Sequence, residues 1–164
     1  MSNPEILKEF WYDLTDDQRS VILNDCFEEY DKFLMGKEFD VEVVKRHCKI
    51  GDEKFIEYAE NGNLELVKIY VQLGANINIC GGYSLRYSAV NGYMGVVRYL
   101  VEHGADIHSM DDCALKWASV KGHLEIVKYL VEHGANVHAE DDYALRWAIK
   151  SNRTEVVEYL KSLS

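Results

Sequence analysis

Histidines that recur at fixed spacing are the first side chains in this chain that are capable of chemistry. His103 and His133 lie thirty residues apart, and so do His108 and His138. A metal site needs ligands that converge within ~2–2.3 Å of one ion. Side chains at one position of successive packed helices lie roughly 10 Å apart, because that distance separates the helices. The spacing therefore predicts rows of turn or capping residues, and no metal or cofactor site.

Two pairs of adjacent aspartates, Asp111-Asp112 and Asp141-Asp142, have the composition of a carboxylate active site. General acid–base catalysis requires one carboxyl group to be desolvated so that its pKa rises. These pairs lie on polar segments before helices, where negative charge interacts favourably with the helix dipole. No phosphate-binding loop, nucleophile elbow or dinucleotide motif occurs in the chain. We therefore predict a protein that is not an enzyme, with no catalytic residue.

The elements that must position these residues belong to a repeated phrase. It reads LRYSAVNGYMGVVRYLVEHGADIH from Leu85 and LKWASVKGHLEIVKYLVEHGANVH from Leu115. A third copy, LRWAIKSNRTEVVEYL, starts at Leu145, and a weaker copy starts at Phe55. A fixed period of this length predicts stacked units, because one unit alone cannot bury its apolar face.

Each unit contains two apolar patches with helical spacing. In the unit from Leu115, a short stripe of Leu115, Ala118 and Ser119 is followed by Gly122, which ends the first helix. The second helix presents one apolar face, formed by Leu124, Val127, Leu130 and Val131. Gly134 ends it, since glycine tolerates a positive φ. The unit is predicted to be helix, turn, helix and loop.

These residues carry a family resemblance. ALKWAS resembles the first helix of an ankyrin repeat, and GHLEIVKYLVEHGANVH resembles its second helix and loop. The resemblance covers Phe55 to Leu160, although Cys113-Ala114 and Tyr143-Ala144 replace the usual Thr-Pro pair. The period is thirty residues rather than 33, and the three missing residues fall in the loop between units. The resemblance therefore implies that the projecting loop between units, the finger of an ankyrin repeat, is shorter than usual. The thirty-residue units are similar to the ankyrin arrays of giant DNA viruses of amoebae.

The predicted fold is all-α, an ankyrin-repeat solenoid of stacked helix-turn-helix units with shortened loops and an N-terminal helical cap. Residues 1–40 form the cap or extension, or else a separate interaction module, and 41–164 form the array. The array comprises a degenerate first unit at 41–54, repeats starting near 55, 85 and 115, and a C-terminal capping repeat near 145. In the cap, a short helix is expected from Pro4, a capping box at Thr15–Gln18 and a helical stripe from Ile22.

Composition excludes several classes of partner. The chain has 164 residues, a net charge of −10 and a pI near 5.0, so nucleic acid and anionic membranes are poor ligands. No apolar run is long enough to span a bilayer, and the first ten residues do not have the pattern of a signal peptide. The four cysteines are scattered, as in reduced intracellular proteins. A cytoplasmic location is expected, in the host cell if the origin is viral.

Two columns of side chains recur on the first helices. Tyr87, Trp117 and Trp147 form an aromatic column, which the resemblance implies is packed in the core between repeats. Arg86, Lys116 and Arg146 form the neighbouring cationic column. These cations either bind an acidic partner or pair with aspartates of the loops. Internal pairing is favoured, because Asp141 and Asp142 lie close in sequence to Arg146.

The resemblance implies that a partner protein binds the concave face formed by loop ends and first helices. The partner-binding residues predicted there are Tyr83, Arg86, Val90, Asn91, Asp112, Cys113, Lys116, Val120, Lys121, Asp142, Tyr143, Arg146 and Lys150. The leading hypothesis is a protein-interaction scaffold. The alternative is a substrate receptor of a ubiquitin ligase, recruited through residues 1–40. A monomer or a weak dimer is expected, with self-association through 1–40 as a further hypothesis. The partner's identity stays open, and a host protein is one candidate.

Overall fold

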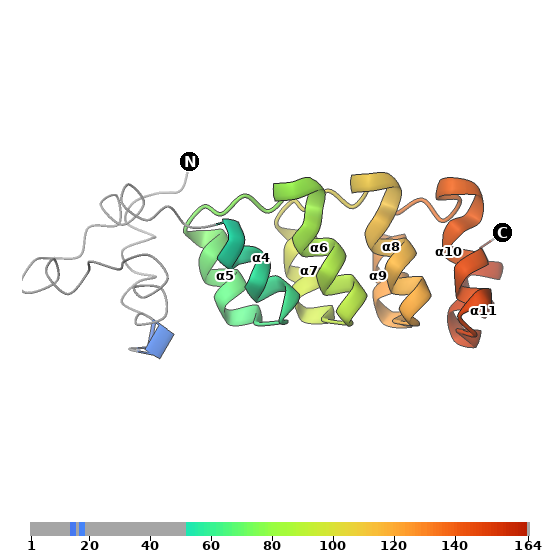
Figure 1. The fold of residues 1–164 in the computed structure, drawn as a ribbon, viewed down its shortest axis with the longest axis horizontal. Helices are drawn as coiled ribbons and strands as arrows, with labels where there is room; N and C mark the ends of the chain where they lie inside the picture. The colour runs from blue at the N-terminus through green and yellow to red at the C-terminus, as the bar shows by residue number, and fades with distance from the viewer. Residues whose placement is uncertain (1–13, 16, 19–51, 164) are drawn as a thin grey trace, which may run out of the picture.

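The structure is a computed structural model that describes residues 14–15, 17–18 and 52–163. Residues 52–163 form helical hairpins stacked in a row (Figure 1). The helices are α4 (Asp52–Glu60), α5 (Leu64–Gln72), α6 (Ile79–Asn91), α7 (Met94–Glu102), α8 (Ser109–Lys121), α9 (Leu124–Glu132), α10 (Ala139–Lys150) and α11 (Thr154–Lys161). No strand occurs in these described ranges. The predicted all-α solenoid of helix-turn-helix units is confirmed.

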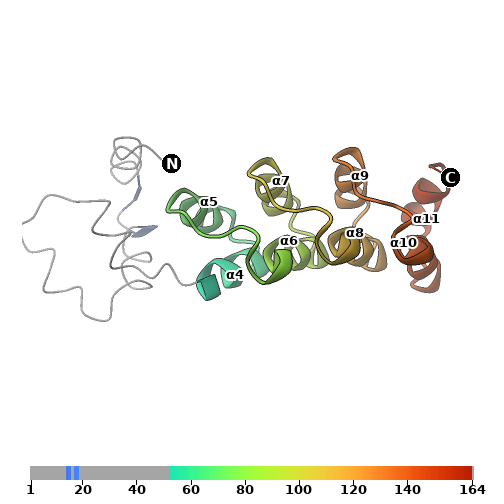
Figure 2. The same ribbon diagram turned by 90° about the horizontal axis from the view of Figure 1, so that it is seen from above.

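The first helices and second helices of the hairpins form two rows. Figure 2 shows α4, α6, α8 and α10 in one row and α5, α7, α9 and α11 in the other. Adjacent first helices share far more contacts than adjacent second helices do. Unequal spacing of the two rows curves a solenoid towards the tighter row. We call the solvent-facing side of the first helices the first-helix face.

The core lies between the two rows and between neighbouring hairpins. In α8, Leu115 is 1% exposed and Ala118 is fully buried, as the stripe predicts. In α9, Val127 and Leu130 are fully buried, whereas Leu124 and Val131 are half-buried against the same core. Small residues such as Ala118 let successive first helices approach closely, and the large side chains of the second helices supply most of the apolar burial.

The loops between hairpins end in a left-handed turn of three residues. Met110, Asp111 and Asp112 have φ of 53, 56 and 58°, and the same conformation recurs at Cys80–Gly82 and Glu140–Asp142. The right-handed part of α8 therefore begins after Asp112. A non-glycine residue in this conformation costs about 1–2 kcal/mol. Among the described residues, the loop that joins two hairpins is thus a compact turn without strands.

Glycines follow both helices of the α8–α9 hairpin. Gly122 has φ +86° and ends α8 in the left-handed conformation, and Gly134 has φ +100° after α9. A Cβ atom at Gly122 would lie 2.7 Å from Cδ of Arg153, so that position has no room for another side chain unless Arg153 moves. The predicted helix ends are confirmed.

Little of the N-terminal region lies within the described residues. The Thr15–Gln18 capping box is confirmed: the Thr15 amide donates to Oε1 of Gln18 at 2.8 Å, and the Gln18 amide donates to Oγ1 of Thr15 at 3.2 Å. The helices expected from Pro4 and near Ile22, the cap and most of the degenerate unit at 41–54 lie outside the described residues. None of the described helices combines the length and the apolar composition needed to cross a membrane.

Candidate binding surface on the first helices

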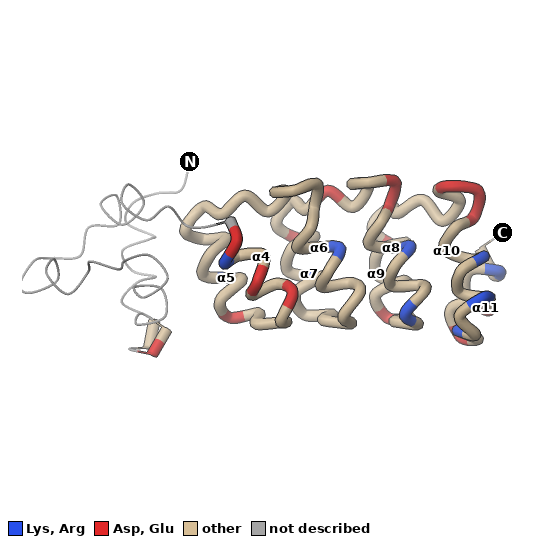
Figure 3. The backbone as a smooth tube through the Cα atoms, viewed as in Figure 1, with Lys and Arg blue, Asp and Glu red and all other residues tan. Residues whose placement is uncertain are grey.

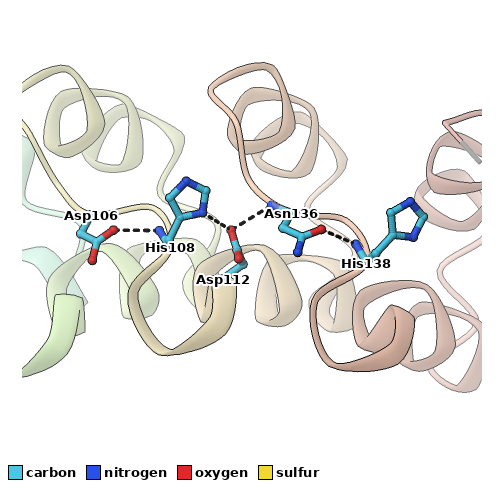
Figure 4. Close-up of polar contacts among 5 residues, drawn as sticks. All are labelled: Asp106, His108, Asp112, Asn136 and His138. Atoms are coloured by element: carbon cyan, nitrogen blue, oxygen red, sulfur yellow. Dashed lines mark hydrogen bonds and ion pairs between the residues drawn. The ribbon is translucent and has the colours of Figure 1, made fainter.

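Polar contacts between successive units hold the first helices in register. The Asp106 carboxylate accepts from the His108 amide at 3.0 Å, and Nδ1 of His108 lies 3.0 Å from Oδ1 of Asp112 (Figure 4). The same Asp112 oxygen accepts from the backbone amide of Asn136 in the next unit at 2.9 Å. Asn136 then repeats the local turn by accepting from the His138 amide at 3.0 Å.

This geometry corrects the prediction for Asp112. It was expected to be an exposed charge and a partner-binding residue, but it is only 4% exposed. Asp112 is buried because the next unit covers it, with the Asn136 amide donating to its carboxylate. Asp142, its equivalent in the last unit, bonds to His138 at 2.6 Å and keeps a side chain 49% exposed.

The preceding junction uses a different residue for the same contact. Gly82 stands at the position of Asp112 and has no carboxylate to offer. Asn78 replaces it: Oδ1 of Asn78 accepts from the Asp106 amide at 2.8 Å, and its Nδ2 donates to the Gly104 carbonyl at 3.1 Å. The backbone amide at the start of each loop thus donates to a side chain of the preceding unit, which is Asn78 at one junction and Asp112 at the next.

The histidines lie in rows, as predicted from their spacing. Nδ1 of His103 and of His133 lies 2.8 and 2.7 Å from the carbonyl oxygens of Tyr99 and Tyr129 one turn earlier. Within the described ranges, no three His, Cys, Asp or Glu side chains converge to form a metal site.

The aromatic column lies on the first-helix face rather than in the core. The rings of Tyr83 and Tyr87 stack with centroids 4.1 Å apart, and those of Tyr143 and Trp147 with centroids 5.5 Å apart. Trp117 is 39% exposed. The expectation of core packing was therefore wrong, because the buried stripe of α8 runs through Leu115, Ala118 and Ser119 and leaves Trp117 to one side. We call Tyr83, Tyr87, Trp117, Tyr143 and Trp147 the aromatic strip.

Cations accompany the strip. The guanidinium carbon of Arg86 lies 4.8 and 5.0 Å from the ring centroids of Tyr83 and Tyr87. Nζ of Lys150 lies 4.1 Å from the ring centroid of Trp147. Such contacts stabilise both the ring and the long side chain in one position.

The cationic column pairs internally, but not with the aspartates. Nζ of Lys116 lies 2.9 Å from Oε1 of Glu140 in the next unit, and Lys116 is only 6% exposed. Arg86 donates to Sδ of Met110 at 3.3 Å, and Arg146 donates to the backbone carbonyl of Glu140 at 3.0 Å. Burial and this ion pair remove Lys116 from the exposed candidates for partner binding.

The remaining candidates lie at the C-terminal ends of the first helices. Val90 and Val120 are half-buried, and Lys121 is exposed. Asn91 donates through Nδ2 to the Glu60 carbonyl of the preceding unit at 3.0 Å.

Sequence reasoning missed two further side chains that bond to the C-terminal ends of the first helices. Nε2 of His123 lies 2.9 Å from the Val90 carbonyl, and Nε of Arg153 donates to the Val120 carbonyl at 3.0 Å. These side chains satisfy helix-end carbonyls of the preceding unit.

Tyrosine ionisation is suppressed on both rows. The hydrogen bond with Tyr87 raises the pKa of Tyr83 to about 12, with burial as a smaller cause. Burial raises the pKa of Tyr99 and of Tyr129 on the second helices.

Acidic and basic residues are distributed unequally among the first helices (Figure 3). In residues 83–91, 113–121 and 143–150 the charged residues are Arg86, Lys116, Lys121, Arg146 and Lys150, with no carboxylate. By contrast, α4 carries Asp52, Glu53, Glu57 and Glu60 beside one lysine. In a chain of net charge −10, these three stretches that carry only cations are a local exception, although the turns that precede two of them hold Asp111, Asp112, Glu140, Asp141 and Asp142.

The sequence model described as "Ankyrin repeats (3 copies)" matches residues 55–141 and 111–163. This chain belongs to the ankyrin-repeat family. Ankyrin repeats are generally protein–protein interaction modules, and the family is typically not enzymatic. The comparison with curated proteins finds no match. In this ankyrin-repeat protein, the aromatic strip and its cations are the feature of the first-helix face that is suited to binding.

Proposed function

We propose that this ankyrin-repeat protein is an interaction scaffold that binds a partner protein on its first-helix face. The observation that carries the proposal is the aromatic strip, in which Trp117 is 39% exposed beside stacked pairs of rings. Tryptophan, tyrosine and arginine are the residues that dominate binding energy in protein interfaces. Side chains held in place before binding lose little conformational entropy on association.

The proposed surface differs from the set predicted from sequence. Tyr83, Arg86, Val90, Asn91, Cys113, Val120, Lys121, Asp142, Tyr143, Arg146 and Lys150 stay in the proposed surface, and Tyr87, Trp117 and Trp147 join it. Asp112 and Lys116 are no longer part of the proposed surface, because each is buried and bonded to the next unit.

Three finer statements belong to this proposal. The likeness of the thirty-residue units to arrays of giant viruses supports a host protein as the partner and the cytoplasm as the place of binding. A monomer or weak dimer is expected, which light scattering will measure. The ubiquitin-ligase receptor alternative depends on residues 1–40, and recovery of ligase subunits by that segment alone would favour it.

Affinity capture tests the proposal. The full chain and a Trp117→Ala, Trp147→Ala variant are used to capture proteins from the native cells, followed by mass spectrometry. A Glu132→Ala, Leu163→Ala variant is the matched control, because both residues are exposed and lie away from the strip. We expect partners that are lost with the strip variant and kept with the control. Partners retained by both variants would refute binding at the first-helix face.

A further inference from the structure

The middle unit of the aromatic strip lacks the stacked pair of rings that its neighbours have. In the flanking units, Tyr83 stacks on Tyr87 and Tyr143 stacks on Trp147. In the middle unit, the small Cys113 takes the place of the first ring and leaves Trp117 39% exposed. Within the described part of the chain, no aromatic ring stacks on Trp117. We call the position over Trp117, where each neighbouring unit has a second ring and this unit has Cys113, the notch.

The flanking pairs show what fits the notch. Tyr143 and Trp147 have centroids 5.5 Å apart and an interplanar angle of 26°, which is an offset stack. Aromatic pairs favour this arrangement at centroid distances of about 4.5–7 Å. A ring from another molecule placed over Trp117 would complete the row of pairs that the chain itself forms on both sides.

The charges around the notch select the rest of the ligand. Arg86 lies in the preceding unit, and Arg146 and Lys150 lie in the following unit, while Lys121 stands at the end of the same helix. Lys116 is already paired with Glu140 and adds no free positive charge. With no carboxylate on the same stretches of helix, a partner that brings carboxylates complements the surface.

The spacing of the units sets the distance between these groups. Equivalent positions of neighbouring helices lie roughly 10 Å apart. An extended chain advances about 3.3 Å per residue, so three residues span one unit. A carboxylate three residues before the ring thus reaches Arg86, and one three residues after it reaches Arg146 or Lys150.

We propose that the first-helix face binds an extended acidic peptide segment, with an aromatic side chain in the notch and a carboxylate three residues to either side. The inference rests on the proposed function and specifies the chemistry of its partner. Cations with exposed rings also bind single-stranded nucleic acid. Exposed Asp111, Glu140 and Asp141 lie in the turns that open α8 and α10, along one edge of the strip (Figure 3). A peptide with two separate carboxylates can place them at the cations and away from this edge, whereas a continuous phosphate backbone carries a charge at every nucleotide.

Synthetic peptides test this inference on the full chain. The probe is fluorescein-labelled Ser-Glu-Gly-Ser-Phe-Gly-Ser-Glu-Ser, titrated by fluorescence anisotropy at 0.15 M salt. We expect saturable binding below 1 mM protein. Binding should be at least tenfold weaker when lysine replaces both glutamates, when glycine replaces phenylalanine, or when both glutamates adjoin the phenylalanine.

Variants of the chain locate the binding site. Cys113→Tyr fills the notch with the residue found at Tyr83 and Tyr143, and it should weaken peptide binding at least tenfold. Cys113→Ser leaves the notch open and should bind as the wild type does. Trp117→Ala removes the floor of the notch and should also lose binding, which keeps the test decisive if Cys113→Tyr does not fold.

The inference is wrong if the peptide does not bind at 1 mM protein, or if the lysine peptide binds as well as the glutamate peptide. It is also wrong if folded Cys113→Tyr or Trp117→Ala binds the peptide as the wild type does. Tighter binding of a thymidine oligonucleotide than of the peptide would overturn it too. If the peptide fails while Trp117→Ala, Trp147→Ala still loses its captured partners, the interaction function stands and only the partner chemistry is wrong. If capture is unchanged as well, both proposals fail.

Discussion

Replacing Asp112 with alanine tests how the repeat units are joined. Its carboxylate is 4% exposed and accepts from the Asn136 amide at 2.9 Å, with Nδ1 of His108 at 3.0 Å. Hydrogen bonds to charged groups contribute about 1.5–3 kcal/mol each when their partners are buried. Since His108 is mostly exposed, the Asn136 bond dominates, and we expect Asp112→Ala to lower the free energy of unfolding by about 2–3 kcal/mol.

Two further substitutions at Asp112 separate the hydrogen bond from the backbone conformation. Asp112→Asn keeps an acceptor for the Asn136 amide and should cost about 1 kcal/mol. Asp112→Gly also loses the bond but removes the left-handed penalty at φ 58°, which is about 1–2 kcal/mol. It should therefore be more stable than Asp112→Ala although it removes more atoms.

Urea denaturation followed by far-ultraviolet circular dichroism measures this series. Asp142→Ala is the control, because its side chain is 49% exposed and its hydrogen bond is to His138 within the same unit. We expect that control to change the free energy of unfolding by less than about 1 kcal/mol. An Asp112→Ala variant within about 0.5 kcal/mol of wild type would refute the inter-unit bond as a source of stability. A glycine variant less stable than the alanine variant would refute the backbone argument.

Three other predictions follow from the same structure. Leu130→Ala should lower the free energy of unfolding by about 2–5 kcal/mol, because Leu130 is fully buried. Leu163→Ala, at a site that is 42% exposed, should change the free energy of unfolding little. A urea midpoint of Leu130→Ala equal to that of the wild type would contradict this prediction. Asp141→Gly should raise the free energy of unfolding by about 1 kcal/mol, because Asp141 is exposed at φ 54°, and a loss of stability in the same assay would show a missed contact. Burial raises the pKa of Tyr99, so its neutral form contributes stability below pH 10 that is lost as the pH rises through the folded-state pKa. Tyr99→Phe should therefore show a smaller fall in melting temperature between pH 9 and 11 than the wild type does. Its melting temperature at pH 7 should not be lower, because the buried hydroxyl has no hydrogen-bond partner among the described residues. If the fall between pH 9 and 11 is unchanged, other groups cause the loss of stability at alkaline pH.

Patterns within one unit predicted the fold well. The i, i+3 and i+6 spacing of Leu124, Val127 and Leu130 identified the second helix, and Gly122 and Gly134 marked the helix ends. These features depend on local geometry, since 3.6 residues per turn and the conformational freedom of glycine act within a few positions. The shortened loop was also predicted from the period, although its left-handed conformation was not, because Met110, Asp111 and Asp112 are not residues that favour it as a run.

The candidate site was predicted less completely. The first helices and most of their exposed side chains were identified by position in the repeat, but Trp117 was assigned to the core and Lys116 to the surface. Lys116 is buried because Glu140, twenty-four residues later in sequence, supplies its counter-charge. Trp117 is exposed because successive first helices meet through Ala118 and Ser119, which are both fully buried.

The sequence by itself determined that residues 52–163 form an all-α ankyrin array, that Gly122 and Gly134 end helices, and which faces of the second helices are buried. Only the tertiary structure decided which polar groups join neighbouring units and which rings and cations reach solvent. Those outcomes depend on contacts between residues about 24 to 33 positions apart, such as Asp112 with Asn136 and Arg153 with Val120. The local pattern of a single unit contains no information about which side chain of the next unit will meet it.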